Sequence, residues 1–486
     1  MRSRTWWALP LFGAIATYIL VMFLSQGQSV WFDEGYSILL AKQSVGELIA
    51  LTGVDAHPPL FYLLLKAWGT IFGWSEFALR SLSAILVSLA VGGMLLVVRK
   101  LFTNRVALVV LPFIVLAPFT LRYGYEIRMY ALVIFIGVLA TLVMMYAVEQ
   151  KKIRYWALYA VLVALGMLTL YMSVVVWLAH AIWLFVRWKD KSWRTFFKQP
   201  WVLAFIGAAA LFAVYVPTLL HQLTHSALPG VGSQLTLTQL ANVAGMVAVF
   251  TPEYQLNGIL SLAIIGIISL TLYLLTVVYV KTPKSQKSAI RLVVALVIVP
   301  FLFYAVISVF SPIFITRYIA HIAIYMYALV GIAVALGWRF GKRRVAVVLA
   351  ALALTVSILG VFQLQSTGNY VFERLQYPEI RQIRETITCN DDTVIVADDP
   401  FAYIDSRYYF DGCQFLFFSK DNLARQGGYA PLHDSELRIS SPDSLTAKKV
   451  IRLGWEGSPN LVPDSRYTLV ESQLYDKQRV DIFQLK

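Results

Sequence analysis

Residues 31–62 read WFDEGYSILLAKQSVGELIALTGVDAHPPLFY and follow the first apolar run of the chain. The segment opens with two adjacent acids, Asp33 and Glu34, and closes with Asp55, His57 and two prolines. A loop that only joined two apolar spans would have no reason to gather these acids and an imidazole in one place. We therefore interpret this loop as the chemical centre of the chain and the apolar runs around it as its support.

Composition identifies the class of protein. The chain has 486 residues, of which 59% are hydrophobic and 14% charged, with a mean hydropathy of +0.68. Soluble domains carry roughly a quarter charged residues, so the composition indicates a polytopic membrane protein. The net charge of +14 does not indicate a nucleic-acid partner, because most Lys and Arg cluster in short loops between apolar runs.

About eleven apolar runs have the length and composition of membrane-spanning helices. The first follows Arg2 and Arg4 but is not followed by a small-residue cleavage site, so we interpret it as an uncleaved span rather than a signal peptide. The runs fall near residues 6–24, 79–98, 106–120, 129–148, 155–170, 171–187, 201–221, 258–280, 290–310, 318–338 and 344–362.

The basic residues predict the orientation of these spans. They concentrate in alternate loops, which lie on the cytoplasmic side if the N-terminus is cytoplasmic. Residues 25–78 then form the first outer loop, and everything after Leu364 also lies outside. We expect a multi-pass protein of the plasma (inner) membrane whose functional loop is extracytoplasmic. The predicted inside loops are near 99–105, 151–154, 187–198, 281–291 and 339–344.

Residues 364–486 differ in character from the apolar residues 1–363. Short β-type runs (TVIVAD, CQFLFF, KKVIRL, YTLVES and RVDIFQL) occur with helix-like stretches at 373–388 and 400–410. A segment of about 120 residues is long enough to bury a core of its own. The sequence therefore predicts a mainly α, polytopic membrane protein with a small extracytoplasmic α/β domain at its C-terminal end.

The cysteine count excludes a disulfide framework and a CxxC metal site, because Cys389 and Cys413 are the only two. They lie on opposite sides of one predicted strand–helix unit. Two interpretations stay open: they pair in an oxidising exterior, or they are two small buried residues.

The acids of the first outer loop allow a structural and a chemical interpretation. Asp33 can cap an amphipathic helix that begins at Glu34 and lies along the membrane surface, and a second short helix can start at Pro58-Pro59. Alternatively, a carboxylate at a membrane-proximal helix start has a raised pKa and acts as a general base. Adjacent acids can also divide the work, with one as the base and the other binding a divalent cation.

Asp55 and His57 are likewise either a capped helix start with a solvated imidazole or part of a site. The loop returns to the membrane here, so these side chains can face Asp33 across the hairpin. With Glu34 they form a plausible set of ligands for Mg, Mn or Zn.

Two arginine-rich motifs stand at the outer ends of predicted spans. In RYGYEIRMY, Arg122 and Glu126 are four residues apart and can pair on a helix. Arg128 stands at the head of a span, where a buried guanidinium is costly unless an anion such as a phosphate compensates it. In SPIFITRYIAH, Arg317 and His321 are one helical turn apart; Arg317 either snorkels to lipid headgroups or binds a substrate phosphate.

The ordered motifs WFDEGYS, DAHPPLFYLLLKAW, FALRSLSAI, RYGYEIRMYAL and SPIFITRYI resemble bacterial members of the GT-C superfamily over roughly residues 1–340. The closest branch is the protein O-mannosyltransferase and aminoarabinose transferase-like group (the glycosyltransferase 39/83 type). Such enzymes transfer a sugar from a polyprenyl-phosphate carrier to a lipid, glycan or protein acceptor on the outer face of the membrane, with inversion. The chain lacks the large luminal insertion of the eukaryotic protein mannosyltransferases, which weakens the case for a protein acceptor.

The resemblance implies roles for individual residues. The acidic pair Asp33 and Glu34 corresponds to the catalytic feature of the family, and Asp55 and His57 to its motif before Pro-Pro. The remaining implied residues bind substrate and lie in the two arginine motifs: Tyr123, Glu126, Arg128, Tyr130, Arg317 and Tyr318.

Two other classes compete with an enzyme. A lipid or glycan transporter, such as a flippase, would place charged groups near the bilayer midplane and often shows internal repeats. A membrane scaffold would leave the acids, imidazole and guanidiniums unexplained. An enzyme requires Asp33, Asp55, Arg128 and Arg317 to converge on one cavity.

Overall fold

The computed structural model describes residues 7–188, 192–225, 234–252, 255–312, 314–367, 380–475 and 477–486. The chain divides into two compact units. The unit that we call the membrane unit comprises Met1–Ser25, Phe77–Pro217 and Pro229–Ser366. The other, which we call the loop–sheet unit, comprises Gln26–Glu76, Thr218–Leu228 and Thr367–Lys486. The loop of residues 26–76 therefore packs with the C-terminal segment.

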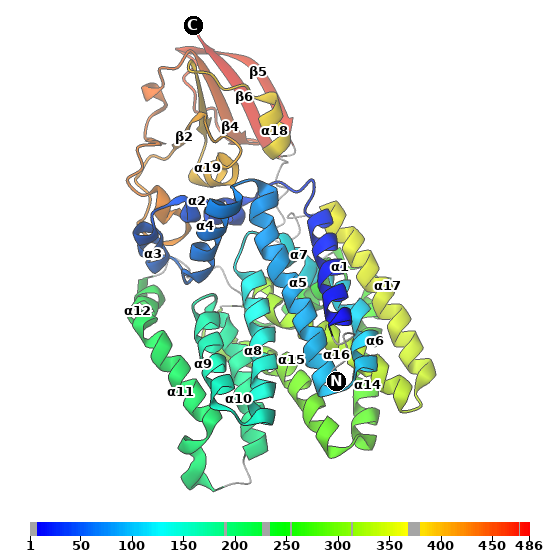
Figure 1. Ribbon diagram of the computed structural model, residues 1–486. Coiled ribbons are helices and arrows are strands. Elements are labelled where there is room, and N and C mark those ends of the chain that lie inside the picture. The colour runs from blue at the N-terminus through cyan, green and yellow to red at the C-terminus, as the bar shows by residue number, and fades with distance from the viewer. Residues whose placement is uncertain are drawn as a thin grey trace. The chain divides into compact units, whose positions relative to one another are not determined.

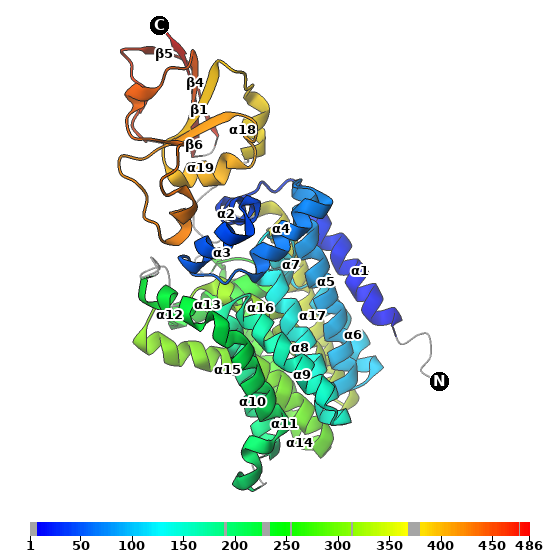
Figure 2. The same ribbon diagram turned by 60° about the vertical axis from the view of Figure 1, so that its left-hand side comes forward.

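The membrane unit is a bundle of helices (Figures 1 and 2). Its α-helices are α1 (Ala8–Leu24), α5 (Glu76–Leu101), α6 (Asn104–Val115), α7 (Pro118–Tyr125), α8 (Tyr130–Gln150), α9 (Ile153–Met167), α10 (Val174–Trp188), α11 (Pro200–Phe212), α13 (Leu237–Val249), α14 (Gly258–Lys281), α15 (Lys284–Phe310), α16 (Ala320–Arg339) and α17 (Arg343–Thr367). Short 3₁₀ turns join some of them: η2 (Tyr171–Ser173), η3 (Trp193–Lys198), η4 (Ala213–Tyr215) and η6 (Thr316–Ile319).

Each of the eleven predicted spans corresponds to a helix or a pair of helices, but fewer meet the length of a span. Among the described residues, eight helices are long and apolar enough to cross a membrane, or nine if the bent pair of α6 and α7 counts as one. The helices α1 and α9 fall short, with 17 and 15 residues. A tilted or locally thinned bilayer accommodates such short helices at a modest cost in free energy.

The run predicted as one span over 106–120 is bent by 63° between α6 and α7. Pro118 occupies the first turn of α7, and Ala117 before it is extended. Proline disfavours a helical conformation in the residue that precedes it, so the helix ends there and a new one begins. The break places residues 118–125 in a separate short helix.

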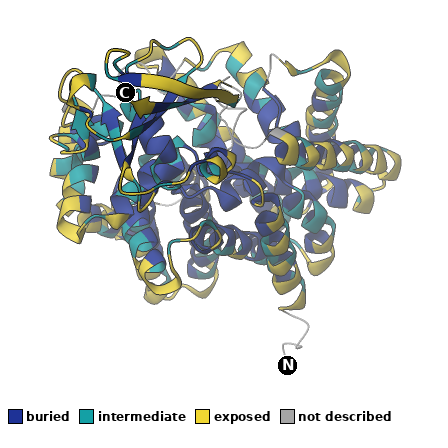
Figure 3. Cartoon of the chain, turned by 90° about the horizontal axis from the view of Figure 1, so that it is seen from above, coloured by how far each residue is buried: buried dark blue, intermediate teal, exposed yellow. Residues whose placement is uncertain are grey.

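Helix α16 lies at the centre of the membrane unit. It packs against α6, α8, α14 and α15. In its most apolar 18-residue stretch 83% of the residues are buried, compared with 22% in the corresponding stretch of α14. Figure 3 shows buried residues, in dark blue, toward the inside of the molecule and exposed residues, in yellow, on the outward faces of the outer helices. Gly331 lets α16 approach α6 closely, because a Cβ there would lie 2.9 Å from the Val110 Cα.

A buried polar network ties four of these helices together. The Thr141 hydroxyl on α8 lies 3.0 Å from His180 Nε2 on α10 and 3.0 Å from the Tyr325 hydroxyl on α16. The other ring nitrogen of His180 lies 3.1 Å from the Tyr159 hydroxyl on α9. In a bilayer, polar side chains need partners within the protein, and His180 has one at each nitrogen.

The helices of the loop–sheet unit begin with α2 (Phe32–Lys42), α3 (Val45–Gly53) and α4 (Leu60–Phe72). The single amphipathic helix predicted from Glu34 through Ile49 is therefore two helices. Ser44 caps the second by accepting a hydrogen bond from the Glu47 N–H at 3.2 Å. The short helix predicted at Pro58-Pro59 is confirmed as α4.

The C-terminal domain contains a six-stranded sheet in the order β3-β2-β1-β4-β6-β5. Strands β1, β2, β3 and β4 run parallel, and β6 is antiparallel to both β4 and β5. Every residue of β1 is buried, as expected for a central parallel strand covered on both faces. The strands are β1 (Thr393–Ala397), β2 (Gln414–Phe418), β3 (Arg438–Ile439), β4 (Lys449–Trp455), β5 (Tyr467–Tyr475) and β6 (Gln478–Leu485).

Helices α18 (Ile380–Thr386) and α19 (Pro400–Arg407) accompany the sheet, with the 3₁₀ turns η8 (Gly427–Leu432) and η9 (Pro442–Ser444). Helix α19 matches the helix predicted over 400–410. For the stretch predicted over 373–388, residues 373–379 lie outside the described residues. The remaining helix of the loop–sheet unit is α12 (Val216–His225), most of which belongs to that unit.

A disulfide bond joins Cys389 and Cys413, whose Cα atoms are 5.6 Å apart. This decides between the two interpretations that the sequence left open. The bridge encloses β1 and α19, and it ties the segment after α18 to the segment after α19. It therefore restrains both helices relative to the sheet.

The polar network of the membrane unit generates a stability prediction. We expect Thr141→Val to lower the free energy of unfolding by about 1 kcal/mol, because it removes the hydroxyl that joins α8 to α10 and α16. The measurement is thermal unfolding of the purified protein in lipid nanodiscs. Thr276→Val is the matched control, since Thr276 is exposed on α14 and donates only within its own helix, to the Leu272 carbonyl. Equal melting temperatures for the two variants would contradict the prediction.

Candidate active site

The two adjacent acids lie in the first turn of α2, and one of them caps the helix. Glu34 is buried, and its Oε2 accepts a hydrogen bond from the Trp31 backbone N–H at 3.3 Å. A helix start leaves such donors without partners within the helix. The prediction that Asp33 caps a helix beginning at Glu34 is wrong: α2 begins at Phe32, and Glu34 reaches back to its start.

Asp33 has a different environment from its neighbour. It is partly exposed, and its backbone carbonyl accepts a hydrogen bond from the Ser37 hydroxyl at 2.9 Å. Its carboxylate stands in the first turn of α2, where the helix dipole favours negative charge. One acid is thus buried against the backbone, while the other remains partly accessible.

Asp55 and His57 lie between α3 and α4 and face each other. His57 Nδ1 is 3.5 Å from Asp55 Oδ2, and their side chains are 14% and 7% exposed. An aspartate beside one ring nitrogen fixes the orientation of an imidazole. The preceding turn is held by Gln222, whose Nε2 donates to the Thr52 carbonyl at 2.7 Å.

The predicted metal set of Glu34, Asp55 and His57 is not assembled. Throughout the part of the chain that the structure describes, no group of three or more His, Cys, Asp or Glu side chains is arranged to hold a metal ion. Glu34 engages the start of α2, and a single Asp–His pair offers fewer ligands than Zn²⁺ or Ca²⁺ sites use. These three residues do not fit a resident ion as a set.

The first arginine motif lies at the junction of α7 and α8 in the membrane unit. Arg122 Nη1 is 3.3 Å from Glu126 Oε2, and both side chains are almost fully buried. The pairing predicted from their spacing is confirmed. The Glu126 carbonyl also accepts a hydrogen bond from the Ser83 hydroxyl at 2.7 Å, which fixes the junction against α5.

Tyr123 lies near residues of both arginine motifs. Its hydroxyl lies within electrostatic range of Arg122, Glu126, Tyr130 and Arg317. Its ring centroid is 4.6 Å from that of Tyr130. Arg317 comes from η6, so the structure brings the two arginine motifs together from distant parts of the sequence.

Arg128 and Tyr318 are the other two predicted residues of the membrane unit. Arg128 is 3% exposed and lies in the non-helical link between α7 and α8, where its backbone N–H donates to the Glu126 carbonyl at 2.8 Å. Tyr318 follows Arg317 in η6, and its carbonyl accepts a hydrogen bond from the Tyr304 hydroxyl at 3.2 Å. Arg128 is thus a buried guanidinium at the head of a span, as its position in the sequence predicted.

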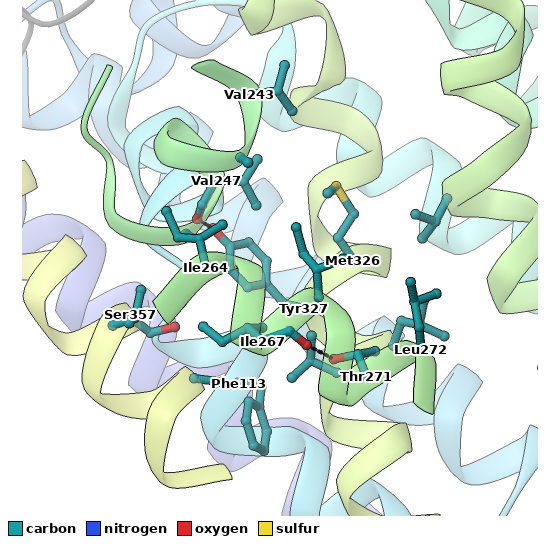
Figure 4. A pocket seen from close by; sticks show the side chains of 18 of the residues that line it. Phe113, Val243, Val247, Ile264, Ile267, Thr271, Leu272, Met326, Tyr327 and Ser357 are labelled. Atoms are coloured by element: carbon teal, nitrogen blue, oxygen red, sulfur yellow. Dashed lines mark hydrogen bonds between the residues drawn. The ribbon is translucent and has the colours of Figure 1, made fainter. Parts of the chain in front are cut away.

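An apolar pocket of about 380 Å³ opens within the membrane unit between α13, α14, α15, α16 and α17. Two of its few polar groups are turned to the backbone: the Tyr327 hydroxyl donates to the Val247 carbonyl, and the Thr271 hydroxyl donates to the Ile267 carbonyl at 2.6 Å (Figure 4). The remaining lining is almost entirely aliphatic and aromatic, which suits a hydrocarbon chain.

Two contacts near candidate residues, one in each unit, were not predicted from the sequence. Asn242 on α13 donates to the Thr316 hydroxyl at 3.0 Å. This bond connects a helix that lines the pocket to η6, the turn that carries Arg317. The ring of Phe32 stacks on that of Phe401 from the C-terminal domain, with centroids 4.4 Å apart. Neither contact has a local signal, because each joins segments far apart in the chain.

Comparison with protein families gives one match. Residues 56–221 match the family described as dolichyl-phosphate-mannose-protein mannosyltransferase. A comparison with curated protein sequences finds no match.

Comparison with solved structures finds likeness over nearly the whole chain. ArnT from Cupriavidus metallidurans bound to undecaprenyl phosphate matches with a TM-score of 0.58 and 11% identity, over 99% of this chain and 98% of that one. Its apo form matches with a TM-score of 0.59 and 10% identity, over 97% of each chain. The Archaeoglobus fulgidus oligosaccharyltransferase in complex with Zn and sulfate matches with a TM-score of 0.52 and 12% identity, over 92% of this chain and 68% of that one.

At these identities the structural likeness shows the fold alone. The family match over residues 56–221 includes His57, α7 and α8. The resemblance noted in the sequence motifs agrees with both. The chain therefore has the fold of the GT-C membrane glycosyltransferases, and about a third of it matches the mannosyltransferase family.

Proposed function

We propose that this protein transfers a sugar from a polyprenyl-phosphate carrier to an acceptor on the outer face of the membrane. The observation that carries the proposal is the end-to-end likeness to ArnT, which was crystallised with undecaprenyl phosphate. The family match, named for a dolichyl-phosphate-mannose donor, supports the same donor class. The acceptor is a lipid, glycan or protein bearing a hydroxyl or amine.

The membrane unit binds the donor in this proposal. Its apolar pocket offers a place for isoprene units, and α13 links the pocket to the turn that carries Arg317. Arg128 and Arg317 bind the phosphate, since a guanidinium offers two parallel donors to phosphate oxygens. When the bond between the sugar and the phosphate breaks, negative charge grows on the phosphate. Fixed guanidiniums stabilise that transition state more than the ground state.

Asp33 acts as the general base. The acceptor oxygen or nitrogen attacks the anomeric carbon while the bond from that carbon to the phosphate oxygen breaks, and the acceptor proton passes to the Asp33 carboxylate. The products are the glycosylated acceptor and polyprenyl phosphate. Attack opposite the leaving group inverts the anomeric configuration. Glu34 supports this role by holding the start of α2 through the Trp31 N–H.

The Asp55–His57 pair orients bound substrate in this proposal. Burial and their mutual contact at 3.5 Å restrict both side chains, which suits groups that hold a sugar hydroxyl in one position. No step requires a divalent metal ion, and activity that survives chelation with EDTA is the expected result. Loss of activity that Mg²⁺, Mn²⁺ or Zn²⁺ restores would show that a metal takes part.

We propose that the protein lies in the plasma (inner) membrane, with its N-terminus in the cytoplasm and the loop–sheet unit outside. The basic loops between spans support this orientation. The disulfide between Cys389 and Cys413 supports an oxidising exterior for the C-terminal domain.

The role of Asp33 is tested by Asp33→Asn, which keeps the size of the side chain but removes its basicity. We expect turnover to fall by about 10²-fold or more, since general-base catalysis contributes on that order, while donor lipid still binds. The measurement is transfer of radiolabelled sugar by protein in proteoliposomes. Glu47→Gln, at an exposed acid of the same loop, is the control and should retain full turnover. Wild-type turnover by Asp33→Asn would remove Asp33 as the base.

The role of Arg128 is tested by Arg128→Lys, which keeps the charge but loses the fork of donors. We expect the apparent KM for donor to rise about tenfold, with a smaller change in the KM for acceptor. Steady-state kinetics with each substrate varied in turn make the distinction. Arg105→Lys serves as the control, because Arg105 is exposed in the first turn of α6, at the cytoplasmic end of that helix by our topology. An unchanged donor KM would contradict phosphate binding by Arg128.

A further inference from the structure

The start of α2 carries the proposed base, yet much of what surrounds it comes from the C-terminal domain. Helix α19 packs directly on α2, and both belong to the loop–sheet unit (Figures 1 and 2). The contact begins at Phe32, next to Asp33, where the Phe32 and Phe401 rings stack with centroids 4.4 Å apart and an interplanar angle of 5°. Tyr429 of η8 meets the edge of the same Phe32 ring, with centroids 5.9 Å apart.

The two helices approach so closely that Gly35 has no room for a side chain. A Cβ at Gly35 would lie 2.4 Å from the backbone carbonyl oxygen of Ile404. Such a clash is with the backbone, so rotation of a neighbouring side chain cannot relieve it. Gly35 follows Glu34 directly, so this contact fixes the depth at which α2 lies against α19.

The chain segments that enter and leave the first loop are also held by the C-terminal domain. The Tyr409 hydroxyl accepts a hydrogen bond from the Val30 N–H at 2.7 Å and donates to Glu76 Oε1 at 2.7 Å. Arg381 of α18 bonds Glu76 Oε2 at 2.6 Å and the Gln28 carbonyl at 3.2 Å. The same domain therefore fixes residues ahead of α2 and residue 76 beyond α4.

The second pair of candidate residues is held by the same domain. The Gly427 N–H donates to the carbonyl of Val54, the residue before Asp55, at 3.0 Å. Gly427 and Tyr429 both belong to η8, so one short turn contacts the start of α2 and the Asp55 loop. The exposed ion pair between Lys42 and Asp411, at 2.8 Å, adds little because water screens it.

We propose that the C-terminal domain positions the loop of residues 26–76, which carries the proposed base. Phe401 and Tyr409 are positioning residues that act through α2 on Asp33. The disulfide between Cys389 and Cys413 restrains α18 and α19, since it joins the segments that follow these two helices. The proposal rests on the proposed function for its kinetic consequences. Its structural content, that α19 holds α2 in place, stands apart from the reaction.

The test uses three variants of the full-length protein: Phe401→Ala, Phe401→Tyr and Gly35→Ala. We expect Phe401→Ala and Gly35→Ala to lower kcat by about 10²-fold, since a displacement near 1 Å at a reacting group has that effect. The KM for donor should stay within about twofold, because the donor binds to the membrane unit. Phe401→Tyr keeps the stacked ring and should restore kcat.

Leu469→Ala is the control, because it shortens an exposed apolar side chain on β5 of the same domain. It should leave both kinetic constants unchanged. Hydrogen exchange read by mass spectrometry gives the independent structural readout. Amides of residues 32–42 should exchange faster in Phe401→Ala than in wild type or Leu469→Ala.

The outcomes separate this proposal from the proposed function. Wild-type kcat and unchanged exchange in Phe401→Ala and Gly35→Ala, with Asp33→Asn inactive, would overturn positioning and leave the glycosyl transfer standing. Full turnover by Asp33→Asn would remove the base while the exchange measurement still decides whether α19 holds α2. A rise in donor KM equal to the fall in kcat/KM would also contradict positioning, since it would indicate lost donor binding.

Discussion

A bilayer offers no water to a buried polar group, and this constraint governs how the membrane unit is built. One group of its buried polar side chains is satisfied by mutual hydrogen bonds, in the network around Thr141 and His180. The guanidiniums are buried in the same way: Arg122 against Glu126, and Arg80 through its hydrogen bond to the Ser25 carbonyl at 3.0 Å. Arg128 is also buried at the head of a span, and in the proposed function it binds the phosphate of the donor.

The loop–sheet unit solves a different problem, because a surface loop has few contacts of its own to hold catalytic groups in place. The start of α2 is fixed from within by Glu34 and from outside by α19 and η8. A reacting group on a mobile loop would sample many positions, most of them unproductive, and the reaction would be slower. A rigid support holds the group in the productive position. The C-terminal domain is therefore a structural part of the proposed catalytic apparatus, whatever else it binds.

The apolar spans could be predicted because hydropathy is a local property of the sequence. The sheet was also largely predictable, since β1, β2, β4, β5 and β6 are short runs rich in β-branched and aromatic residues. Strand β3 has only two residues, too few for a pattern. The break between α2 and α3 has a local signal in the sequence, because Ser44 and Glu47 have the spacing of a capping box at a helix N-terminus.

Other parts of the site could not be predicted. Glu34 can cap α2 only if the helix begins at Phe32, because the Trp31 N–H then lies within reach of its side chain. A start one or two residues later would remove that contact. The close approach of Gly35 to Ile404 joins segments far apart in the sequence. The same is true of the approach of Arg317 to Tyr123. A single sequence carries residue types and spacing, so it indicated the candidate residues of each cluster but not the neighbours that hold them.

The central claim, that an isoprenoid-phosphate sugar is the donor, is tested most directly by incubating the protein in proteoliposomes with a panel of radiolabelled polyprenyl-phosphate sugars and an extract of envelope acceptors. The account predicts that one donor is consumed and that polyprenyl phosphate and a glycosylated product appear in equal amounts, with the anomeric configuration inverted. Movement of an intact donor across the bilayer without cleavage would contradict it and would indicate a transporter.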